Sequence, residues 1–553
     1  MPDTMDSAYE RCSTRTGGWV AGGTRRVSWA SCWGSRTPIG LLCRGSGWGG
    51  FAGRTALAAL LTAGCSPDSR PGTPPRDVLL ITVDTLRADH LSSWLYPRTT
   101  SRSPNEPLRE AGQIFDLDAL AASGVMFRNA FAHRGQTFPS ISTLLTGRDP
   151  FNHGSVDNVG GGLAPSVPTL AEVLFDAGFS TGAFTTNRLL GPGAYPNGRP
   201  GRPSGIERGF ERFHHDFADA DRDFKAVQDA ANWVKEQRAN GDPQLFTWVH
   251  LMGPHLPYDP QPLNGTVFAE LFTDPDYSGP ANGSREFLDT AYEEGRGLSG
   301  EDIYQVVALY DAEIARVGRL LELFFLVYDD LGGGDNGGLE RTLTIFASDH
   351  GEELYQRNGY WAHSKSVYSS VLHVPLVFHH PPSLTGRRVI DEIVQLDDVL
   401  PTVCEWLELD LPYGVTGRSL LPVLDEWRGR PFESRPAFGH WQDRIFTVRD
   451  GRFRLVWNPE EVEPTDNPKG AYPVPQLALF DLAQDPLELH DVAGQFPGEV
   501  ERLRGELGQW IDTRELPADA RGLADPARMA GLAALGYVEP MPAEQPDPEE
   551  DSR

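Results

Sequence analysis

The chain contains few cysteines for its length. Five occur in 553 residues, and four of them precede residue 66, namely Cys12, Cys32, Cys43 and Cys65. The rest of the chain holds only Cys404, so neither a disulfide framework nor a thiolate metal site can form there. A lone cysteine in a globular body is typically a buried structural residue, and we expect this of Cys404.

Positive charge and long hydrophobic runs are also scarce. The chain has 49 Lys and Arg against 77 Asp and Glu, which gives a formal net charge of -28. A phosphate backbone would repel this charge, so we expect no nucleic-acid partner. No run of about 18 apolar residues follows residue 65, which argues against a protein with several membrane spans. The length is sufficient for one large domain with a smaller companion.

Residues 1–75 do not have the pattern of a folded domain. Arg54–Cys65 combines a basic start, a short apolar stretch and small residues at its end, so it resembles a bacterial lipoprotein signal with Cys65 as the lipidated residue. The Pro-rich residues 66–75 would form a tether, and the true start could lie within this region. The pattern predicts an exported cell-envelope protein facing the periplasm or exterior, with the membrane contacted only through the lipid anchor at Cys65. The alternative is a buried apolar helix.

Strands and helices alternate along residues 76–430. Buried strands are predicted at Asp77–Val83, Ser180–Phe184, Leu245–Leu251, Thr342–Ala347 and Val374–Phe378, with helices between them and a long surface excursion at 259–299. This alternation predicts an α/β domain in which helices cover both faces of a large, mostly parallel sheet. Residues 431–515 have a hairpin signal at Asp450-Gly451 and predict a smaller antiparallel sheet-plus-helix subdomain. Residues 516–553 form an extension and acidic tail.

The segment from Gln136 to Arg148 has the pattern of a helix preceded by a hydroxyl. Pro139 suits the first helical turn, and Gly147 suits the end of the helix. Thr137 therefore lies at the helix N-terminus, where free N–H groups and the macrodipole favour negative charge. Taken alone, this segment is more typical of a helix cap than of a nucleophile.

Polar residues follow two of the predicted strands. Asp84 ends the first strand, and Asp349-His350 follows another. Because parallel strands end at one edge of a sheet, these residues and Thr137 can meet there. Two carboxylates, an imidazole and a hydroxyl predict a site for one divalent metal ion, for which Ca²⁺, Mn²⁺ or Mg²⁺ is a better match than Zn²⁺.

Further histidines and a lysine could bind a tetrahedral anion beside this metal. These residues are His250, His255, His363 and Lys365. Each alone is more typical of a structural histidine or a solvated lysine, but together they provide donors for an anion and its leaving group.

Several motifs together resemble the sulfatase-type family of the alkaline phosphatase superfamily, over about residues 76–515. They are Val83–Asp89, Pro139–Ser140, Leu144–Arg148, His250–Tyr258, Ser348–Glu352, His363–Lys365, Gly417–Pro422, Leu479–Pro486 and Leu535–Tyr537. The resemblance implies an alkaline phosphatase-like fold. It also implies metal ligation by Asp84, Thr137, Asp349 and His350, catalysis by Thr137, His255 and Lys365, and substrate binding by His250, His363 and Asn187.

The chain departs from this family at several functional positions. Sulfatases carry a cysteine or serine that is oxidised to formylglycine, where this chain has Thr137. Ile141 replaces an arginine, and Thr185–Arg188 replaces a segment with a lysine and a histidine. Thr85 replaces the second aspartate of the opening pair, and we expect it to cap the next helix. Gly253 replaces an aspartate, which argues against a second metal ion.

These departures bear on the reaction. A formylglycine hydrate expels sulfate by breaking a bond at carbon, which a threonine ester cannot do, whereas water can resolve a phosphothreonine. The leading hypothesis is therefore a metal-dependent hydrolase of phosphate mono- or diesters, acting on a small-molecule, glycan or lipid-headgroup substrate. The alternatives are a sulfatase with an atypical nucleophile and a non-catalytic binder of anionic ligands.

Overall fold

The computed structural model describes the residues that carry the predicted site. These are residues 74–103, 115–155, 157–158, 162–191, 204–215, 221–293, 297–331, 338–357, 359–384, 387–424, 431–441, 444–459 and 474–513, with 515, 517 and 519. All of them belong to one compact unit, residues 70–553. The predicted leader and lipid anchor lie outside the described residues.

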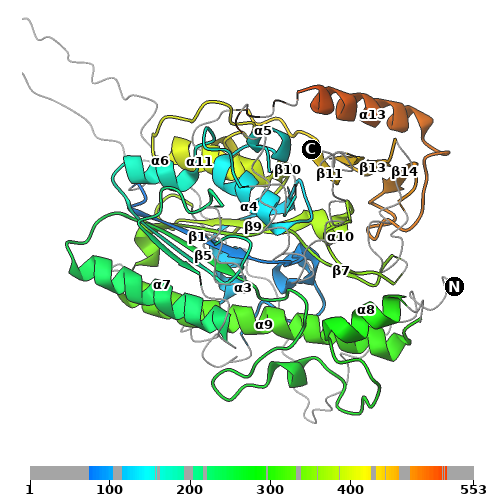
Figure 1. Ribbon diagram of the computed structural model, residues 1–553, viewed down its shortest axis with the longest axis horizontal. Helices are drawn as coiled ribbons and strands as arrows, with labels where there is room; N and C mark the ends of the chain where they lie inside the picture. Colours follow the sequence, from blue (N-terminus) through cyan, green and yellow to red (C-terminus); the bar gives the residue numbers. More distant parts are fainter. Residues whose placement is uncertain are drawn as a thin grey trace, which may run out of the picture. The chain divides into compact units, whose positions relative to one another are not determined.

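An eight-stranded sheet forms the centre of this unit (Figure 1). Its strands, in spatial order, are β10 (Arg388–Gln395), β2 (Val125–Phe131), β9 (His373–His379), β6 (Thr342–Ser348), β1 (Asp77–Val83), β5 (Leu245–Leu251), β3 (Ser180–Thr185) and β4 (Arg212–His215). Only β9 runs antiparallel to its neighbours. The prediction of a mostly parallel sheet is therefore confirmed.

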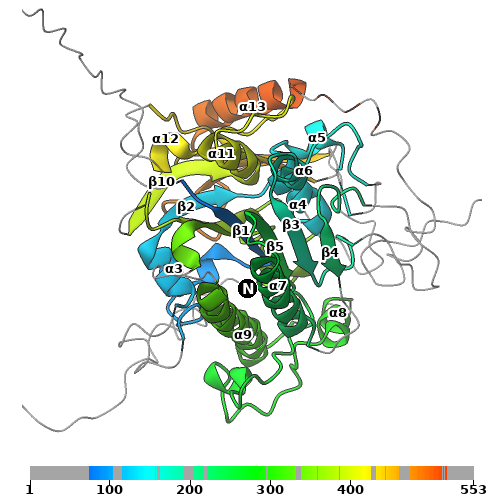
Figure 2. The same cartoon turned by 90° about the vertical axis from the view of Figure 1, so that its left-hand side faces the viewer.

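Helices cover both faces of the sheet, as Figures 1 and 2 show. One face packs against α4 (Thr137–Thr146), α6 (Leu170–Asp176), α11 (Val399–Trp406) and α12 (Leu421–Leu424), and the other against α3 (Leu117–Ser123), α7 (Arg222–Ala239) and α9 (Gly300–Leu331). Strand β1 contributes to both cores, because Val78 and Leu80 face one layer and Leu79 and Ile81 the other. Burial on both faces explains its unbroken apolar run.

Shorter elements connect these layers. They are η1 (Ala88–His90), η2 (Ser92–Trp94), α5 (Pro150–His153), η3 (Phe268–Leu271), α8 (Arg285–Glu293), η4 (Leu339–Arg341), β7 (Glu353–Leu354), β8 (Trp361–Ala362), α10 (Ser369–Leu372) and η5 (Leu396–Asp398). The region 259–299, predicted as a surface excursion, thus contains the helix α8. Cys404 is buried, as expected.

A separate antiparallel sheet forms the C-terminal subdomain. It contains β11 (Ala437–Trp441), β12 (Ile445–Asp450), β13 (Phe453–Trp457) and β14 (Leu477–Asp481), and α13 (Pro497–Asp512) packs on it. The hairpin at Asp450-Gly451 is confirmed. Among the described residues, none of the helices combines the length and apolarity needed to cross a membrane.

Candidate active site and metal centre

The site lies where β1, β5 and β6 end. Because β1 pairs in parallel with both neighbours, Val83 lies beside Leu251 on one side and Ser348 on the other. The residue that follows each strand therefore emerges at one edge of the sheet, and the Asp84 amide donates to the carbonyl oxygen of Leu251 at 2.8 Å. This register brings Asp84 and Asp349 together although they are 265 positions apart in the chain.

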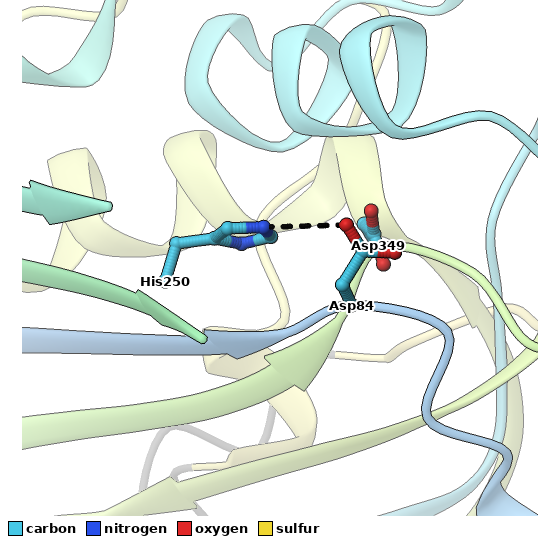
Figure 3. Close-up of side chains that lie close together, drawn as sticks. All are labelled: Asp84, His250 and Asp349. Carbon is cyan, nitrogen blue, oxygen red and sulfur yellow. Dashed lines mark ion pairs between the residues drawn. The ribbon is translucent and has the colours of Figure 1, made fainter. Parts of the chain in front are cut away.

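The two carboxylates are buried, and each presents an oxygen without a hydrogen-bond partner among the described residues. Asp349 Oδ1 accepts from the amides of Thr85 at 3.2 Å and His350 at 2.8 Å, whereas Asp349 Oδ2 has no such partner. Asp84 Oδ1 is likewise unpartnered. Both side chains are fully buried, and Figure 3 shows them converging with the His250 ring pointing toward them.

This proximity separates the pKa values of the two carboxyl groups. Burial, reinforced by the charge of Asp84, raises the pKa of Asp349 well above its usual range. Burial also tends to raise the pKa of Asp84, but His250, His255 and His350 hold it well below its usual range. Two adjacent buried carboxylates therefore require either a shared proton or a cation between them.

The chemistry of this cluster fits a divalent cation. One ligand atom from each of Asp84, His250 and Asp349 lies within 4.8 Å of the others, and His250 Nε2 is also unpartnered among the described residues. His250 Nε2 lies 3.5 Å from Asp84 Oδ2, and its Nδ1 lies 2.8 Å from Thr82 Oγ1. Carboxylate oxygens and an imidazole nitrogen are ligands for a hard or borderline divalent metal. The structure thus adds His250, predicted as a substrate-binding residue, to the possible ligands.

Thr137 and His350 complete the predicted quartet. Thr137 Oγ1 lies 3.4 Å from both Asp84 Oδ2 and His350 Nε2. His350 Nδ1 donates to the carbonyl oxygen of Gly351 at 2.9 Å, so Nε2 of the neutral ring carries the lone pair. That nitrogen is 3.5 Å from Asp349 Oδ2 and 3.9 Å from Asp84 Oδ1. All four predicted ligands therefore meet at one place.

The helix that carries Thr137 is wholly buried. Every residue of α4 is inaccessible to solvent, and Gly147 ends the helix in a left-handed conformation. Thr137 is the first residue of the helix, and Gln136 occupies the cap position without a side-chain cap bond. Thr137 is therefore not a capping residue, and its hydroxyl faces the carboxylates from the helix N-terminus.

Asn187 contacts a predicted metal ligand directly. Its Nδ2 donates to Asp84 Oδ2 at 2.6 Å, while its Oδ1 accepts from the Leu189 amide at 2.8 Å. Both ends of the amide are thus engaged within the protein. In this structure Asn187 orients Asp84, and its predicted contact with substrate stays a prediction.

A second group of residues faces the quartet from loops. The ring of His363 lies 4.5 Å from that of His350 and 5.2 Å from that of His255. His363 Nδ1 donates to Glu352 Oε1 at 2.9 Å, and His255 Nδ1 donates to the Leu256 carbonyl at 2.7 Å. Burial lowers the pKa of His255 to about 4 and raises that of Glu352 to about 7. Burial also lowers the pKa of His363 well below its usual range, so near pH 7 the neutral form is favoured for both His255 and His363.

Glu352 was not assigned a role from the sequence, although it lies in the motif Ser348–Glu352. Its fixed distance of two residues from His350 is the signal that could have identified it. Lys365 is half-buried, two residues after His363. Its predicted contact with the anion stays a prediction.

The departures from the family pattern have clear structural consequences. Ile141 packs in the hydrophobic core, and the Thr186 hydroxyl donates to Asp223 Oδ1 at 2.9 Å. Gly253 has a φ of +39°, and a Cβ there would lie 2.7 Å from a methyl group of Val317. The cap predicted for Thr85 is wrong, because Thr85 has a φ of 55° and its hydroxyl has no partner among the described residues.

The sheet order, the buried helix at its edge and the paired carboxylates define an alkaline phosphatase-like fold with a candidate metal centre. Residues 76–409 match the sulfatase family. The chain therefore belongs to the sulfatase family, whose enzymes are ester hydrolases that bind a divalent metal.

Similar proteins include both sulfatases and phosphonate hydrolases. Arylsulfatase K of Xenopus laevis is 25% identical over 313 residues, which cover 54% of this chain and 57% of the relative. The multifunctional alkaline phosphatase superfamily protein PehA of Trinickia caryophylli is 30% identical over 333 residues, which cover 57% of this chain and 56% of that protein. The match thus spans little more than half of either relative.

A solved structure with the same fold is the phosphonate monoester hydrolase of Agrobacterium radiobacter. Its TM-score is 0.61 at 22% identity, and the match covers 80% of this chain and 96% of that one.

Proposed function

We propose that this protein is a metal-dependent hydrolase of phosphate mono- or diesters that uses Thr137 as its nucleophile. The observation that carries the proposal is the position of Thr137 Oγ1, 3.4 Å from both Asp84 Oδ2 and His350 Nε2. The similarity to PehA and to a phosphonate monoester hydrolase supports phosphorus as the reacting atom. The predicted leader further suggests an envelope-anchored enzyme.

Asp84, Asp349, His350 and His250 would hold the cation, which when bound supplies positive charge for the ester oxygens and favours ionisation of a nearby hydroxyl. The Thr137 oxygen attacks phosphorus and the bond to the leaving alcohol breaks, which gives a phosphothreonine and the free alcohol. Water then attacks phosphorus and the bond to Thr137 breaks, which releases phosphate from a monoester or a phosphate monoester from a diester. In net terms the Thr137 proton ends on the leaving alcohol, and one proton of the water restores the Thr137 hydroxyl.

The histidines on the loops are suited to the leaving group. Because His255 and His363 both have Nδ1 engaged as a donor, Nε2 is the ring nitrogen that each has available to accept a proton. The negative charge of a bound ester raises the pKa of a nearby imidazole, so His255 Nε2 can take up a proton and give it to the leaving oxygen.

The test compares wild-type protein with Thr137→Ala, both loaded with metal, on 4-nitrophenyl phosphate, bis(4-nitrophenyl) phosphate and 4-nitrophenyl sulfate. We expect the substitution to lower phosphate-ester turnover by on the order of 10⁴-fold. Ser142→Ala is the matched control, because it removes a buried hydroxyl from the same helix that has no hydrogen-bond partner among the residues described by the structure. Equal activity of Thr137→Ala and wild type would refute the proposal.

The second candidate is a sulfuric ester hydrolase, which the similarity to arylsulfatase K favours. It predicts faster turnover of 4-nitrophenyl sulfate than of either phosphate ester. Mass spectrometry of protein quenched during turnover separates the two, since a phosphoryl group retained on Thr137 is expected only for the first. Metal-loaded protein that binds these esters and cleaves none would indicate a non-catalytic binder.

A further inference from the structure

Arg285 differs from the paired arginines of the surrounding structure. It is the first residue of α8, in the region 259–299, and it is half-buried. Arg316 and Arg98 pair with Asp221 and Asp311, but no ion pair or hydrogen bond joins the Arg285 side chain to any other residue that the structure describes. A guanidinium that is partly removed from water and lacks a counter-ion favours an anion as its partner.

The helix α8 lies between the two segments that carry the catalytic histidines. At its start, the Tyr258 amide donates to the carbonyl oxygen of Gly283 at 3.0 Å, which places Arg285 beside the segment that follows His255. At its other end, Tyr292 packs edge-on against Tyr360 with ring centres 5.6 Å apart, three residues before His363. The position of α8 is thus fixed from both sides of the histidine pair.

The positive charge of Arg285 affects the pKa values of His255 and His363. Burial is the main reason why the pKa values of His255 and His363 are low, and the Arg285 charge acts in the same direction on both. Burial raises the pKa of Glu352, and Arg285 opposes this rise. Arg285 is not among the leading influences on Asp84 or Asp349. Together with the contacts that hold α8 beside Tyr258 and Tyr360, these influences place Arg285 near His255 and His363, on the leaving-group side of the proposed site.

We propose that Arg285 binds a second negative charge, carried by the leaving alcohol of the substrate. The preferred ester is then one whose alcohol bears an acidic group such as a carboxylate. This inference rests on the proposed function, because that function makes His255 and His363 the leaving-group side. A local cation also offsets the formal net charge of -28, which would otherwise repel such a substrate.

The test uses two esters that differ only in one ring carboxylate, phenyl phosphate and 3-carboxyphenyl phosphate, with phosphate release by metal-loaded protein as the readout. We expect Arg285→Gln to lower kcat/KM for the carboxylated ester by about 10- to 100-fold, the value of one charged hydrogen bond. For phenyl phosphate we expect kcat/KM to change by less than about twofold, since this ester has no carboxylate for Arg285 to bind. Arg285→Lys retains the charge and should restore part of the preference.

The matched control is Arg128→Gln, which makes the same change of charge at an exposed residue paired with Asp391. It should leave the ratio of the two kcat/KM values unchanged. Equal losses on both esters with Arg285→Gln would show that Arg285 acts on the transferred group or on folding, and no loss on either would show that it binds neither. Both outcomes overturn the inference.

A binding measurement keeps the inference separate from the reaction. Calorimetric titration of metal-loaded Thr137→Ala with each ester should show tighter binding of 3-carboxyphenyl phosphate, and Thr137→Ala/Arg285→Gln should lose this preference. If wild-type protein hydrolyses neither ester but the binding preference is present, the proposed function fails and the assignment of Arg285 stands. Equal affinity for the two esters overturns the assignment whether or not either is hydrolysed.

Discussion

The two sides of the candidate active site are built differently. The sheet side, consisting of Asp84, Thr137, His250, Asp349 and His350, occupies strand ends and one helix end inside the core. The loop side, consisting of His255, Arg285, Glu352 and His363, lies on connecting segments and on α8. The pairing of long parallel strands fixes the sheet side, whereas single backbone bonds and side-chain contacts between distant segments hold the loop side. In the proposed mechanism, metal binding and nucleophilic attack therefore depend on the core, and leaving-group recognition depends on peripheral elements.

The C-terminal subdomain contributes to the loop side through a buried ionic network. Glu353 Oε1 accepts from the hydroxyls of Ser366 at 2.6 Å and Ser370 at 2.7 Å, which fixes the segment that carries His363. Glu488, which follows β14, accepts from the hydroxyl of Ser369 at 2.8 Å and pairs with Arg454 of β13 at 2.6 Å. The small sheet therefore contacts the segment that carries His363 and helps to hold it in place.

Removing one carboxylate from the sheet side should cause the largest loss of metal affinity and of activity. We expect Asp349→Asn to lower metal affinity and phosphate-ester turnover by at least about 100-fold, since an amide oxygen is a poorer ligand than a carboxylate. Metal-free Asp349→Asn should instead be more stable than metal-free wild type, because the buried Asp349 carboxyl must either take up a proton or place a like charge next to Asp84, and an amide does neither. Metal content by mass spectrometry and thermal unfolding with and without chelator measure the two effects.

Asp391→Asn is the control for this substitution, because Asp391 is an exposed carboxylate that pairs with Arg128. It should alter neither metal content nor stability appreciably. If Asp349→Asn bound metal as wild type does, the ion would not depend on the sheet side, and the comparison of the two sides would fail.

A substitution in the ionic network should lower activity through the loop side while leaving metal binding at the sheet side unchanged. Glu488→Gln leaves the buried Arg454 guanidinium without its counter-charge, and we expect a loss of stability of about 3 kcal/mol. Because the segment with His363 loosens, kcat/KM should fall by about 10-fold while metal content stays unchanged. Glu499→Gln on α13, where the ion pair with Arg502 is solvent-exposed, is the control and should change little. Parallel loss of metal and activity would contradict a separate role for the loop side.

The last prediction concerns stability alone, and it involves the start of the region that leads to α8. Glu313 of α9 accepts from the Asp259 amide at 3.0 Å, and burial raises the pKa of this carboxyl to about 8. Below the pKa of the unfolded chain, near 4.5, Glu313 is protonated in both states. As the pH rises toward 8, only the unfolded chain ionises, so the folded protein loses stability by on the order of 4 kcal/mol. Glu313→Gln should flatten this loss between pH 5 and 8 in urea unfolding, and an unchanged slope would contradict it.

The sheet side was largely predictable from the sequence. An apolar strand followed by Asp84, another followed by Asp349-His350, and a helix headed by Thr137 are each local patterns. The rule that parallel strands end at one edge brings them together. The contact between His250 and Asp84 was not predictable, because it depends on the register of β1 against β5. Thr82 lies beside His250 in that register, across 168 residues of chain.

The loop side was predictable only in part. His255 and His363 were identified through their motifs. The sequence between residues 259 and 299 has the composition of a loop, so α8 was not predicted. Arg285 has no local signal, since its position depends on long-range contacts such as the bond between Tyr258 and Gly283. The role of Glu488 could not be predicted for the same reason, because Arg454 and Ser369 approach it from other elements.

The glycine at position 253 has a consequence for how the chemistry of this site could diversify. An aspartate there would meet Val317 of α9 on one side, and its Cβ would also lie 3.0 Å from Val83 of β1. A single substitution of Gly253 by aspartate would therefore not be enough to build a second metal site, because at least one of these valines would have to become smaller at the same time. Engineering a second ion into this chain would therefore need paired changes in the packing beneath the site.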